Sequence, residues 1–170
     1  MDLKDKIAEY PDFPKRGVLF RDIWPIVNEP DAFSFVLDRF EGHFNRDVKL
    51  IAGIESRGFV FASALAARLR KAFIPIRKQG KLPGPTVTVD YEIEYGSATM
   101  EMQTHSITAG TNVVIIDDLL ATGGTAEASA RLVTKLGGNI IGFGFVVELR
   151  LLGGKEKLQG FDIFSLVEYE

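Results

Sequence analysis

Two adjacent acids followed by a glycine-rich loop stand in the stretch VVIIDDLLATGGT, residues 113–125. The apolar residues before the acids predict a buried strand, so Asp117 and Asp118 are expected where this strand leaves the core. Because side chains alternate along a strand, we expect the two carboxylates to diverge. Diverging carboxylates suit a diol or a hydrated metal ion better than a shared proton.

The loop after the acids has the composition of an anion site. Glycine tolerates tight turns, so backbone amides can converge on a ligand, and the helix predicted next would favour a negative group at its N-terminus. The acids and the loop together predict a ribose 5-phosphate site. The acids would bind the 2- and 3-hydroxyls, and the 5-phosphate would be bound by Ala121, Thr122, Gly123, Gly124 and Thr125.

Three familiar motifs do not fit these residues. A P-loop ends in Gly-Lys-Ser/Thr, and here no lysine follows the glycines. A dinucleotide fingerprint has its acid far downstream of the glycines, whereas here the acids precede them. A nucleophile elbow reads Gly-x-Ser-x-Gly, but Ile54 stands two residues before Ser56. We therefore expect the phosphate to be a group by which the protein binds its substrate, and not the group that is transferred.

Composition limits the ligands and the compartment. The chain has 170 residues, 46% of them hydrophobic and 25% charged, which is typical of one soluble globular domain. A net charge of -3 offers no general attraction for nucleic acid or membranes. The absence of cysteine excludes disulfides, thiolate catalysis and cysteine-bound metals. With no signal-peptide pattern and no membrane-length apolar run, we expect a cytoplasmic protein.

Apolar periodicity divides the chain into alternating helices and strands. Helices are predicted at residues 2–9, 29–44, 58–70 and 125–137, and strands at 48–54, 72–77, 112–117, 139–149 and 162–169. Two alternating runs at 87–95 and 98–103, joined by a turn near Gly96, predict a hairpin. The two histidines, His43 and His105, fall in a phenylalanine-rich helix and in a turn, and we expect them to be structural or exposed.

This order of elements predicts an α/β fold with a mostly parallel twisted sheet and helices on both faces. Right-handed crossovers place the carboxyl ends of parallel strands at one edge, where ligands bind. The segment ESRG at residues 55–58 follows one predicted strand, and the acids follow another. We therefore expect ESRG and the acid–loop stretch to share one crevice.

Several stretches together resemble the type I phosphoribosyltransferases, and within them the adenine-specific group. The acid–loop stretch resembles the motif for phosphoribosyl pyrophosphate (PRPP). Further matches, in the same order, are YPDFPKRGVLFRDI, IAGIESRGFVFASALA, RKQGKLPGPT, YEIEYG and VVELRLLGGKEKL. The resemblance implies a single domain over residues 1–170, with a base-covering segment at 1–27 and a mobile hairpin at 78–103.

The resemblance also implies an activity. It is the transfer of phosphoribose from PRPP to adenine, which gives AMP and pyrophosphate and depends on Mg²⁺, in a homodimer without nucleic-acid or membrane partners. Two alternatives stay open: a non-catalytic regulator that senses PRPP on the same fold, and a transferase for another purine. The 6-oxopurine transferases carry an aspartate three residues after the acid pair, and here that position is Ala121.

The resemblance assigns pyrophosphate to the ESRG loop and to a basic segment after the next strand. It implies a cis peptide between Glu55 and Ser56, and the arginine side chain offers a fork of donors. The predicted pyrophosphate residues are Glu55, Ser56, Arg57, Gly58, Arg77 and Lys81, of which Arg57 and Lys81 are also catalytic candidates. For Lys78, a solvated surface charge is an equal alternative.

The remaining assignments concern the base and its proton. Leu19 would meet adenine through its backbone, Phe20 would either stack on the base or belong to the core, and Arg21 would hold this segment or approach the base. Leu149 would form the apolar wall opposite. The resemblance points to Glu94 as the acid–base residue, with Tyr95 beside it, on a hairpin that closes over the substrates. The alternative for Glu94 is an exposed strand residue.

Overall fold

The computed structural model describes residues 1–44, 47–93 and 96–170. Its main sheet contains β3 (Leu50–Ile54), β4 (Ala72–Lys78), β5 (Thr86–Ile93), β6 (Gly96–Gln103), β7 (Asn112–Leu120), β8 (Asn139–Leu149) and β9 (Ile163–Tyr169). The seven strands are ordered β5-β6-β4-β3-β7-β8-β9. All neighbours from β4 to β9 in this order are parallel, whereas β5–β6 and β6–β4 are antiparallel. The predicted mostly parallel sheet is confirmed.

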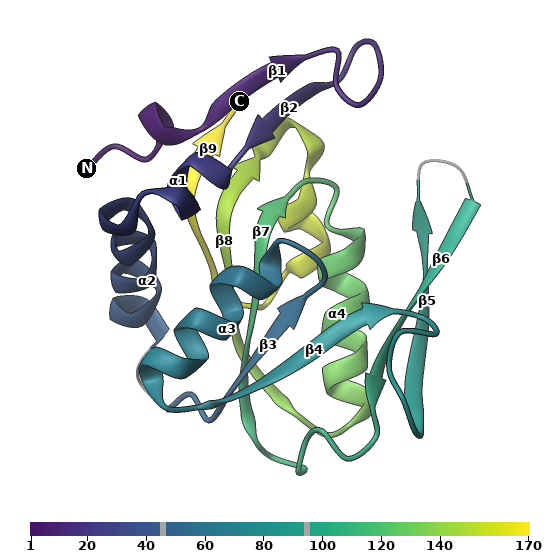
Figure 1. Ribbon diagram of the computed structural model, residues 1–170. Coiled ribbons are helices and arrows are strands. Elements are labelled where there is room, and N and C mark those ends of the chain that lie inside the picture. The colour runs from purple at the N-terminus through teal and green to yellow at the C-terminus, as the bar shows by residue number, and fades with distance from the viewer. Residues whose placement is uncertain (45–46, 94–95) are drawn as a thin grey trace.

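Helices cover both faces of the sheet (Figure 1). They are α1 (Trp24–Asn28), α2 (Pro30–Phe44), α3 (Gly58–Leu69) and α4 (Gly124–Lys135), with short 3-10 helices at Lys4–Lys6, Arg150–Leu152 and Gly154–Leu158. The predicted helices at 29–44, 58–70 and 125–137 are confirmed to within two residues at each end. Across the described ranges, none of the helices is long and apolar enough to cross a membrane.

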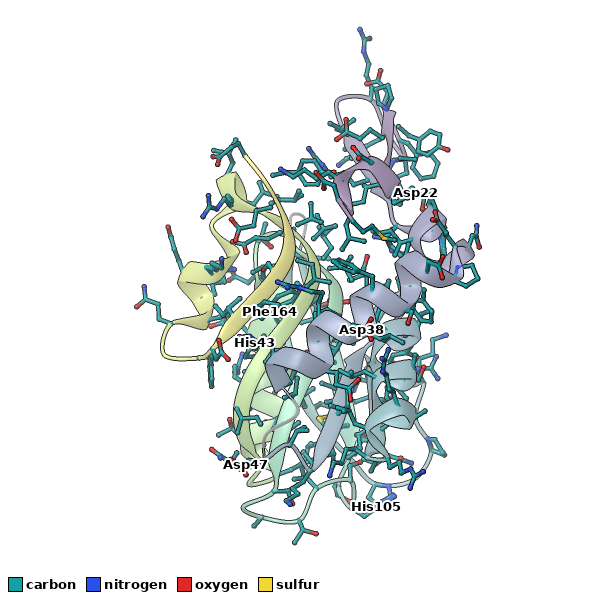
Figure 2. All side chains as sticks on the ribbon, turned by 90° about the vertical axis from the view of Figure 1, so that its left-hand side faces the viewer. Asp22, Asp38, His43, Asp47, His105 and Phe164 are labelled. Carbon is teal, nitrogen blue, oxygen red and sulfur yellow. The ribbon has the colours of Figure 1, made fainter. Side chains whose placement is uncertain are left out.

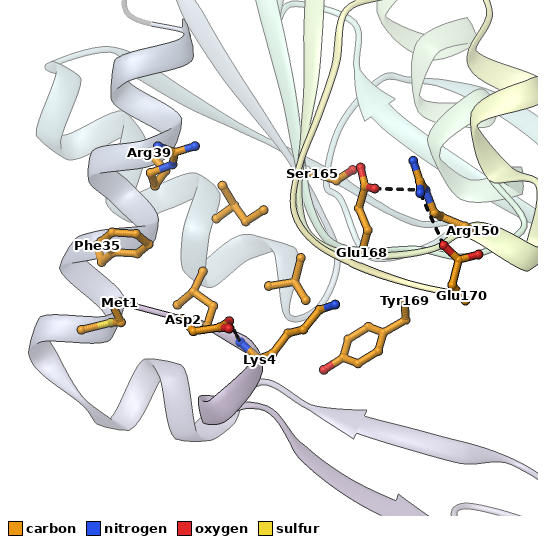
Figure 3. Close-up of a pocket in the computed structure, with 13 residues that line it drawn as sticks. Met1, Asp2, Lys4, Phe35, Arg39, Arg150, Ser165, Glu168, Tyr169 and Glu170 are labelled. Atoms are coloured by element: carbon orange, nitrogen blue, oxygen red, sulfur yellow. Dashed lines mark hydrogen bonds and ion pairs between the residues drawn. The ribbon is translucent and has the colours of Figure 1, made fainter.

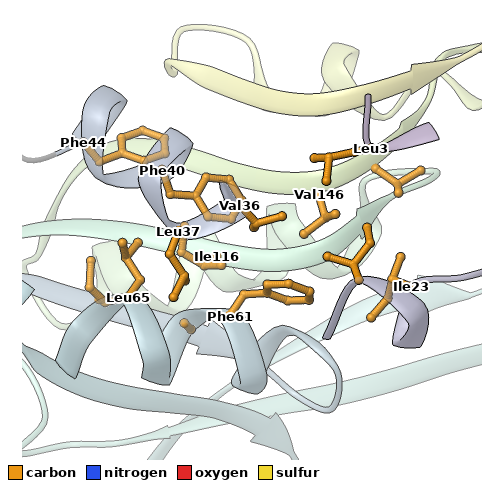
Figure 4. Close-up of a cluster of buried hydrophobic side chains, with 14 of the residues drawn as sticks. Leu3, Ile23, Val36, Leu37, Phe40, Phe44, Phe61, Leu65, Ile116 and Val146 are labelled. Atoms are coloured by element: carbon orange, nitrogen blue, oxygen red, sulfur yellow. The ribbon is translucent and has the colours of Figure 1, made fainter. Parts of the chain in front are cut away.

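The strand β7 shows how the sequence divides the core in two. Its apolar residues alternate between the faces of the sheet, as strand geometry requires. Val114 and Ile116 join α2 and α3 in one cluster, which Figure 4 shows around Phe40 and Phe61. Val113 and Ile115 join α4 in the other. Because β7 is covered on both sides, its apolar run is continuous, and its end is held rigidly where the acids emerge.

The N-terminal segment differs from the prediction. The helix expected at 2–9 is replaced by the 3-10 turn and then by β1 (Ala8–Pro11), which pairs antiparallel with β2 (Leu19–Asp22). Pairing with β2, the next strand along the chain, overrides local helix propensity here. This second hairpin projects beyond the main sheet at the top of Figure 1.

The predicted hairpin at 87–103 is present as β5–β6, but it is less exposed than its alternating pattern suggested. Val89, Met100 and Met102 are buried in the α4-side cluster. From α4, Arg131 donates to the Asp90 carbonyl at 3.1 Å and Lys135 to the Thr88 carbonyl at 2.8 Å. The alternating pattern, which is typical of an exposed ribbon, therefore does not describe the part of the hairpin that packs on α4. Mobility of its tip stays a prediction.

Candidate active site

A cleft of about 390 Å³ opens at the carboxyl ends of β3 and β7. The two strands are parallel neighbours, with Gly53 opposite Ile116, so the segments that follow them emerge side by side. The cleft is lined by Ile54, Glu55, Arg57, residues 91–93 from β5, and residues 117–125. The expectation that ESRG and the acid–loop stretch share one crevice is confirmed.

The two acids lie deeper in the protein than predicted. The strand β7 continues to Leu120, and Asp117 and Asp118 are each only 7% exposed. Burial raises the pKa of Asp117 well above its ordinary value, and the charge of Asp118 adds to this. The Asp118 amide donates to Oδ1 of Asp117 at 2.8 Å, and divergence of the two carboxylates stays a prediction.

Arg57 connects the acids to the neighbouring loop. Its Nη2 lies 2.7 Å from Oδ2 of Asp118, and its guanidinium lies 5.1 Å from the centre of the Phe20 ring. The next residue must be glycine, because a Cβ at Gly58 would lie 2.6 Å from Oδ1 of Asp117. The start of α3 therefore fits directly against the end of β7, which fixes the position of Arg57.

The predicted phosphate loop rests on a segment to which the sequence had assigned no role. Gly123 has a φ of +80° and precedes α4. A Cβ at Gly123 would lie 2.6 Å from the Gly154 carbonyl, and one at Gly154 would lie 2.4 Å from the Ala121 carbonyl. Beside this contact, Lys155 pairs with buried Glu148 at 2.7 Å. In the sequence, the double glycine at 153–154 was the feature that could have indicated a close contact with the loop.

Glu55 was predicted to bind pyrophosphate, but its side chain is bound by other residues of the protein. The Glu55–Ser56 peptide is cis, as the resemblance implies. The Glu55 carboxylate accepts hydrogen bonds from Arg77, at 3.0 and 3.2 Å, and from the Lys78 amide at 3.0 Å. These bonds, that of Arg77 foremost, lower the pKa of Glu55 although burial opposes them. The backbone of Glu55, and not its charged side chain, is thus the group that suits an anion.

Glu101 is a residue that the sequence reasoning missed. It is only 3% exposed, and its Oε1 accepts hydrogen bonds from the amides of Lys81 at 2.9 Å and Leu82 at 2.8 Å. Burial alone would raise the pKa of Glu101, but the hydrogen bonds from the backbone of residues 80–82 bring it below its ordinary value. In the sequence, an acid between two methionines, Met100 and Met102, was the feature that could have indicated a buried carboxylate.

The predicted base-side residues lie beside this cleft and not in its lining. Leu19 is 43% exposed on β2, and Phe20 borders a hollow of about 250 Å³ together with Tyr10, Phe13 and Asp22. Leu149 ends β8, where it pairs with Tyr169. The contact between Phe20 and Arg57 links this region to the acids.

Arg21 has a structural environment. Its guanidinium lies 3.9 Å from the centre of the Tyr169 ring, and its Nε lies 3.4 Å from Glu9. It thus attaches the N-terminal hairpin to β9, which agrees with the first of its two predicted roles. Lys78 is exposed. The candidate residues Glu94 and Tyr95 lie outside the described residues, and the flanking Ile93 lines the cleft.

A second hollow, of about 830 Å³, is larger but carries none of the expected chemistry. It lies between the N-terminus, α2 and β9 (Figure 3). Arg150 on its wall is paired with Glu168 at 3.0 Å and Glu170 at 3.5 Å. We therefore place the active site in the smaller cleft, where the motifs converge.

The histidines also stand apart from that cleft. His43 bonds to Asp162 at 2.7 Å and stacks on Phe164 at 4.1 Å (Figure 2). His105 is exposed in a turn after β6. Both environments agree with the predicted structural or exposed roles.

Comparison with known proteins assigns the chain to a family. Residues 33–163 match the phosphoribosyl transferase domain. The adenine phosphoribosyltransferase of Nitrosopumilus maritimus is 51% identical over 170 residues, which cover 99% of this chain and all of that protein. The structure of the Thermoanaerobacter pseudethanolicus enzyme matches with a TM-score of 0.95 and 45% identity over 98% of both chains. That of the Saccharomyces cerevisiae enzyme, complexed with adenine and an imino-altritol bisphosphate, matches at 0.91 and 43% over 96% of both. The chain therefore belongs to the phosphoribosyltransferase family, among the adenine phosphoribosyltransferases.

Proposed function

We propose that this chain transfers phosphoribose from PRPP to adenine, forming AMP and pyrophosphate in purine salvage. In this reaction the bond from C1 of the ribose to pyrophosphate breaks, a bond from C1 to N9 of adenine forms, and N9 loses a proton. The observation that carries the proposal is the convergence of the acid pair, the phosphate loop and Arg57 in one cleft. Family membership agrees with it.

Ribose and its 5-phosphate would be held by the end of β7 and the start of α4. Asp118 would accept a hydrogen bond from a ribose hydroxyl, and Asp117, close enough to interact with it, would contribute to the same diol. The loop from Ala121 to Thr125 would bind the 5-phosphate through its amides and the α4 N-terminus. This anchoring would keep C1 in place while its bond to pyrophosphate breaks.

The pyrophosphate side would stabilise a leaving group that gains negative charge. The segments at residues 55–58 and 77–81 contain four cations, of which Arg57, Arg77 and Lys81 are the proposed pyrophosphate ligands and Lys78 is not. Cations held in place before the reaction stabilise developing charge without reorganising. Arg77 is oriented by Glu55 at 3.0 Å, while the amides of the cis loop at Ser56 and Gly58 complete the proposed set.

Magnesium fits this site as a companion of the substrate. Mg²⁺ favours one or two carboxylates together with substrate phosphates and water. Asp118 Oδ2 is buried, and although Arg57 Nη2 lies 2.7 Å away, this oxygen accepts no well-aligned hydrogen bond among the described residues; Asp117 is the next carboxylate along β7. No group of three or more His, Cys, Asp or Glu that could hold a metal occurs in the same ranges. The two acids would hold a Mg²⁺ that PRPP brings, directly or through water, and the ion would neutralise phosphate charge.

Adenine would enter between the N-terminal hairpin and the cleft. The exposed Leu19 would present its backbone to the base edge, Phe20 would stack or close the site, and Leu149 would form the opposite wall. Glu94, with Tyr95, would handle the N9 proton from the β5–β6 tip, whose flanking residues Tyr91 and Ile93 line the cleft. We further expect a cytoplasmic homodimer.

A base-selectivity assay tests the proposal. The purified chain is incubated with PRPP and Mg²⁺ and with adenine, hypoxanthine, guanine or xanthine, and the nucleotide formed is quantified. We expect AMP from adenine and at least 100-fold lower kcat/KM for hypoxanthine, because groups paired with one purine edge are left unpaired by the other. Comparable values would indicate another purine transferase, and PRPP binding without any product would indicate a regulator.

A further inference from the structure

Glu101 places a negative charge beneath the basic segment of the site. It lies on β6 between two buried methionines and is 3% exposed. Instead of pairing with a cation, its Oε1 accepts hydrogen bonds from two consecutive amides, those of Lys81 and Leu82. A buried carboxylate is costly unless its hydrogen bonds are satisfied, so these two amides are held firmly in one orientation.

The backbone of Lys81 is fixed from both sides. Its amide is bound by Glu101 at 2.9 Å, and its carbonyl accepts a hydrogen bond from Nη1 of Arg77 at 3.2 Å. Arg77 is in turn bound by Glu55, the first residue of the ESRG loop. A continuous chain of contacts thus runs from Glu101 through Lys81 to the loop proposed to bind pyrophosphate.

The side chain of Lys81, in contrast, is left available. Lys81 is exposed, and its ammonium has no hydrogen bond or ion pair with other residues in the described parts of the chain, 1–44, 47–93 and 96–170. Its charge nevertheless contributes to lowering the pKa of Glu55. Because its backbone is fixed, the region that the Lys81 ammonium can sample is limited to the surroundings of Glu55 and the ESRG loop.

We propose that Glu101 is a positioning residue, which holds the backbone of Lys81 so that its ammonium reaches the pyrophosphate group of PRPP. This inference rests on the proposed role of Lys81. It assigns to Glu101 an effect on ligands that contain pyrophosphate and none on ligands that lack it. A purely structural role in the hairpin would affect both kinds of ligand equally.

Calorimetry with two ligands tests the inference in Glu101→Gln, which keeps the side-chain shape but removes the charge. Affinity for PRPP with Mg²⁺ should fall about 10-fold, since the hydrogen bonds from the two amides to Oε1 become weaker when the acceptor loses its charge. Affinity for AMP, which lacks pyrophosphate, should stay within about 2-fold of the parent. Gln103→Met is the matched control, because it removes the adjacent hydrogen bond from Gln103 to the Pro83 carbonyl, 2.9 Å, and should change neither affinity. If Glu101→Gln does not fold, Glu101→Asp replaces it in the same comparison.

A double-mutant cycle with Lys81→Ala decides whether the effect passes through Lys81. Lys81→Ala alone should weaken PRPP binding, and adding Glu101→Gln should weaken it no further. Additive losses, or equal losses for PRPP and AMP, would overturn the inference while leaving the proposed activity standing. Unchanged PRPP affinity in Lys81→Ala would overturn both the role of Lys81 and the inference, whereas absence of AMP synthesis by the parent would overturn the proposed function itself.

Discussion

Arg57 and Asp118 lie within 2.7 Å of each other, between the loop before α3 and the end of β7. One guanidinium therefore serves two neighbouring parts of the cleft, the acid pair and the proposed pyrophosphate loop. Both side chains are largely buried, at 19% and 10% exposure, so the pair is little screened by solvent. This single contact would thus link the proposed ribose site to the proposed pyrophosphate site.

Replacing Asp118 by Ala should weaken AMP binding by about 1.5–3 kcal/mol, the usual contribution of a hydrogen bond to a charged group. Titration calorimetry with AMP measures this directly. Asp162→Ala is the matched control, because it removes a carboxylate that is paired with His43 at 2.7 Å outside the cleft. Unchanged AMP affinity in Asp118→Ala would contradict the diol role.

The raised pKa of Asp117 predicts a specific dependence of stability on pH. Burial is the main cause, followed by the charge of Asp118. Because the folded-state pKa lies above the ordinary 3.8, the folded protein binds more protons than the unfolded chain between these values. The free energy of unfolding therefore falls as pH rises through that interval.

The Asp117→Asn variant cannot ionise at position 117, so this position should not lower its free energy of unfolding as the pH rises. Urea denaturation without ligand, from about pH 4 to about pH 8, should show the variant gaining stability relative to the parent as pH rises. The gain should level off above the folded-state pKa. A difference between the two proteins that is constant over the whole range would show that Asp117 ionises normally.

The sequence predicted the parts of the fold that depend on local patterns. The continuous apolar run of β7 and the helical spacing of α2 are properties of single segments, and both elements are present. The strand β1 was missed because its residues pair with β2, at positions 8–11 and 19–22. The pattern of a single segment does not show which other segment it pairs with. In addition, a short polar segment next to a 3-10 turn resembles the start of a helix.

The candidate site, like the fold, was predicted only in part. Asp118 and Arg57 could be placed near one another because parallel strands end at one edge, and the structure pairs them. The role of Glu101 could not be predicted, because its carboxylate binds the backbone amides of Lys81 and Leu82, which lie 20 and 19 residues away in the sequence. Gly154 was missed for a similar reason, since its contact with Ala121 depends on the path of the chain after β8.

Gly154→Ala should disturb the phosphate loop. The added Cβ would lie 2.4 Å from the Ala121 carbonyl, a backbone atom that can move only with the loop. We expect KM for PRPP to rise about 10-fold or more and unfolding to become easier by about 1–3 kcal/mol. Steady-state kinetics and urea denaturation measure the two effects.

Gly42→Ala provides the control for this substitution. Gly42 lies in α2 with no atom within 4 Å of an added Cβ, so the change should stabilise the helix by up to about 1 kcal/mol and leave KM unchanged. If Gly154→Ala behaves like Gly42→Ala, the segment from 153 to 155 does not support the loop.

Glu94→Ala should lower turnover far more than substrate affinity. A positioned acid or base contributes about 10²–10⁴-fold to rate, and the tip of β5–β6 brings its described neighbours Tyr91 and Ile93 to the cleft. Thermal stability should change little, because a substitution away from the core has small effects and the flanking Glu92 and Ile93 are exposed. Steady-state kinetics on adenine and PRPP, a single-turnover rate and a melting curve measure the three quantities.

Glu92→Ala separates the role of Glu94 from a general loss of negative charge. Glu92 is an exposed acid of the same hairpin that also lines the cleft, so its replacement should leave the single-turnover rate within a few-fold of the parent. Equal losses in the two variants would assign the effect to the charge of the hairpin. A normal single-turnover rate in Glu94→Ala would make the hairpin a lid only, and the N9 proton would have to pass to another group. A much lower melting temperature would instead make Glu94 structural, because loss of folded protein, and not loss of a proton acceptor, would then explain the lower turnover.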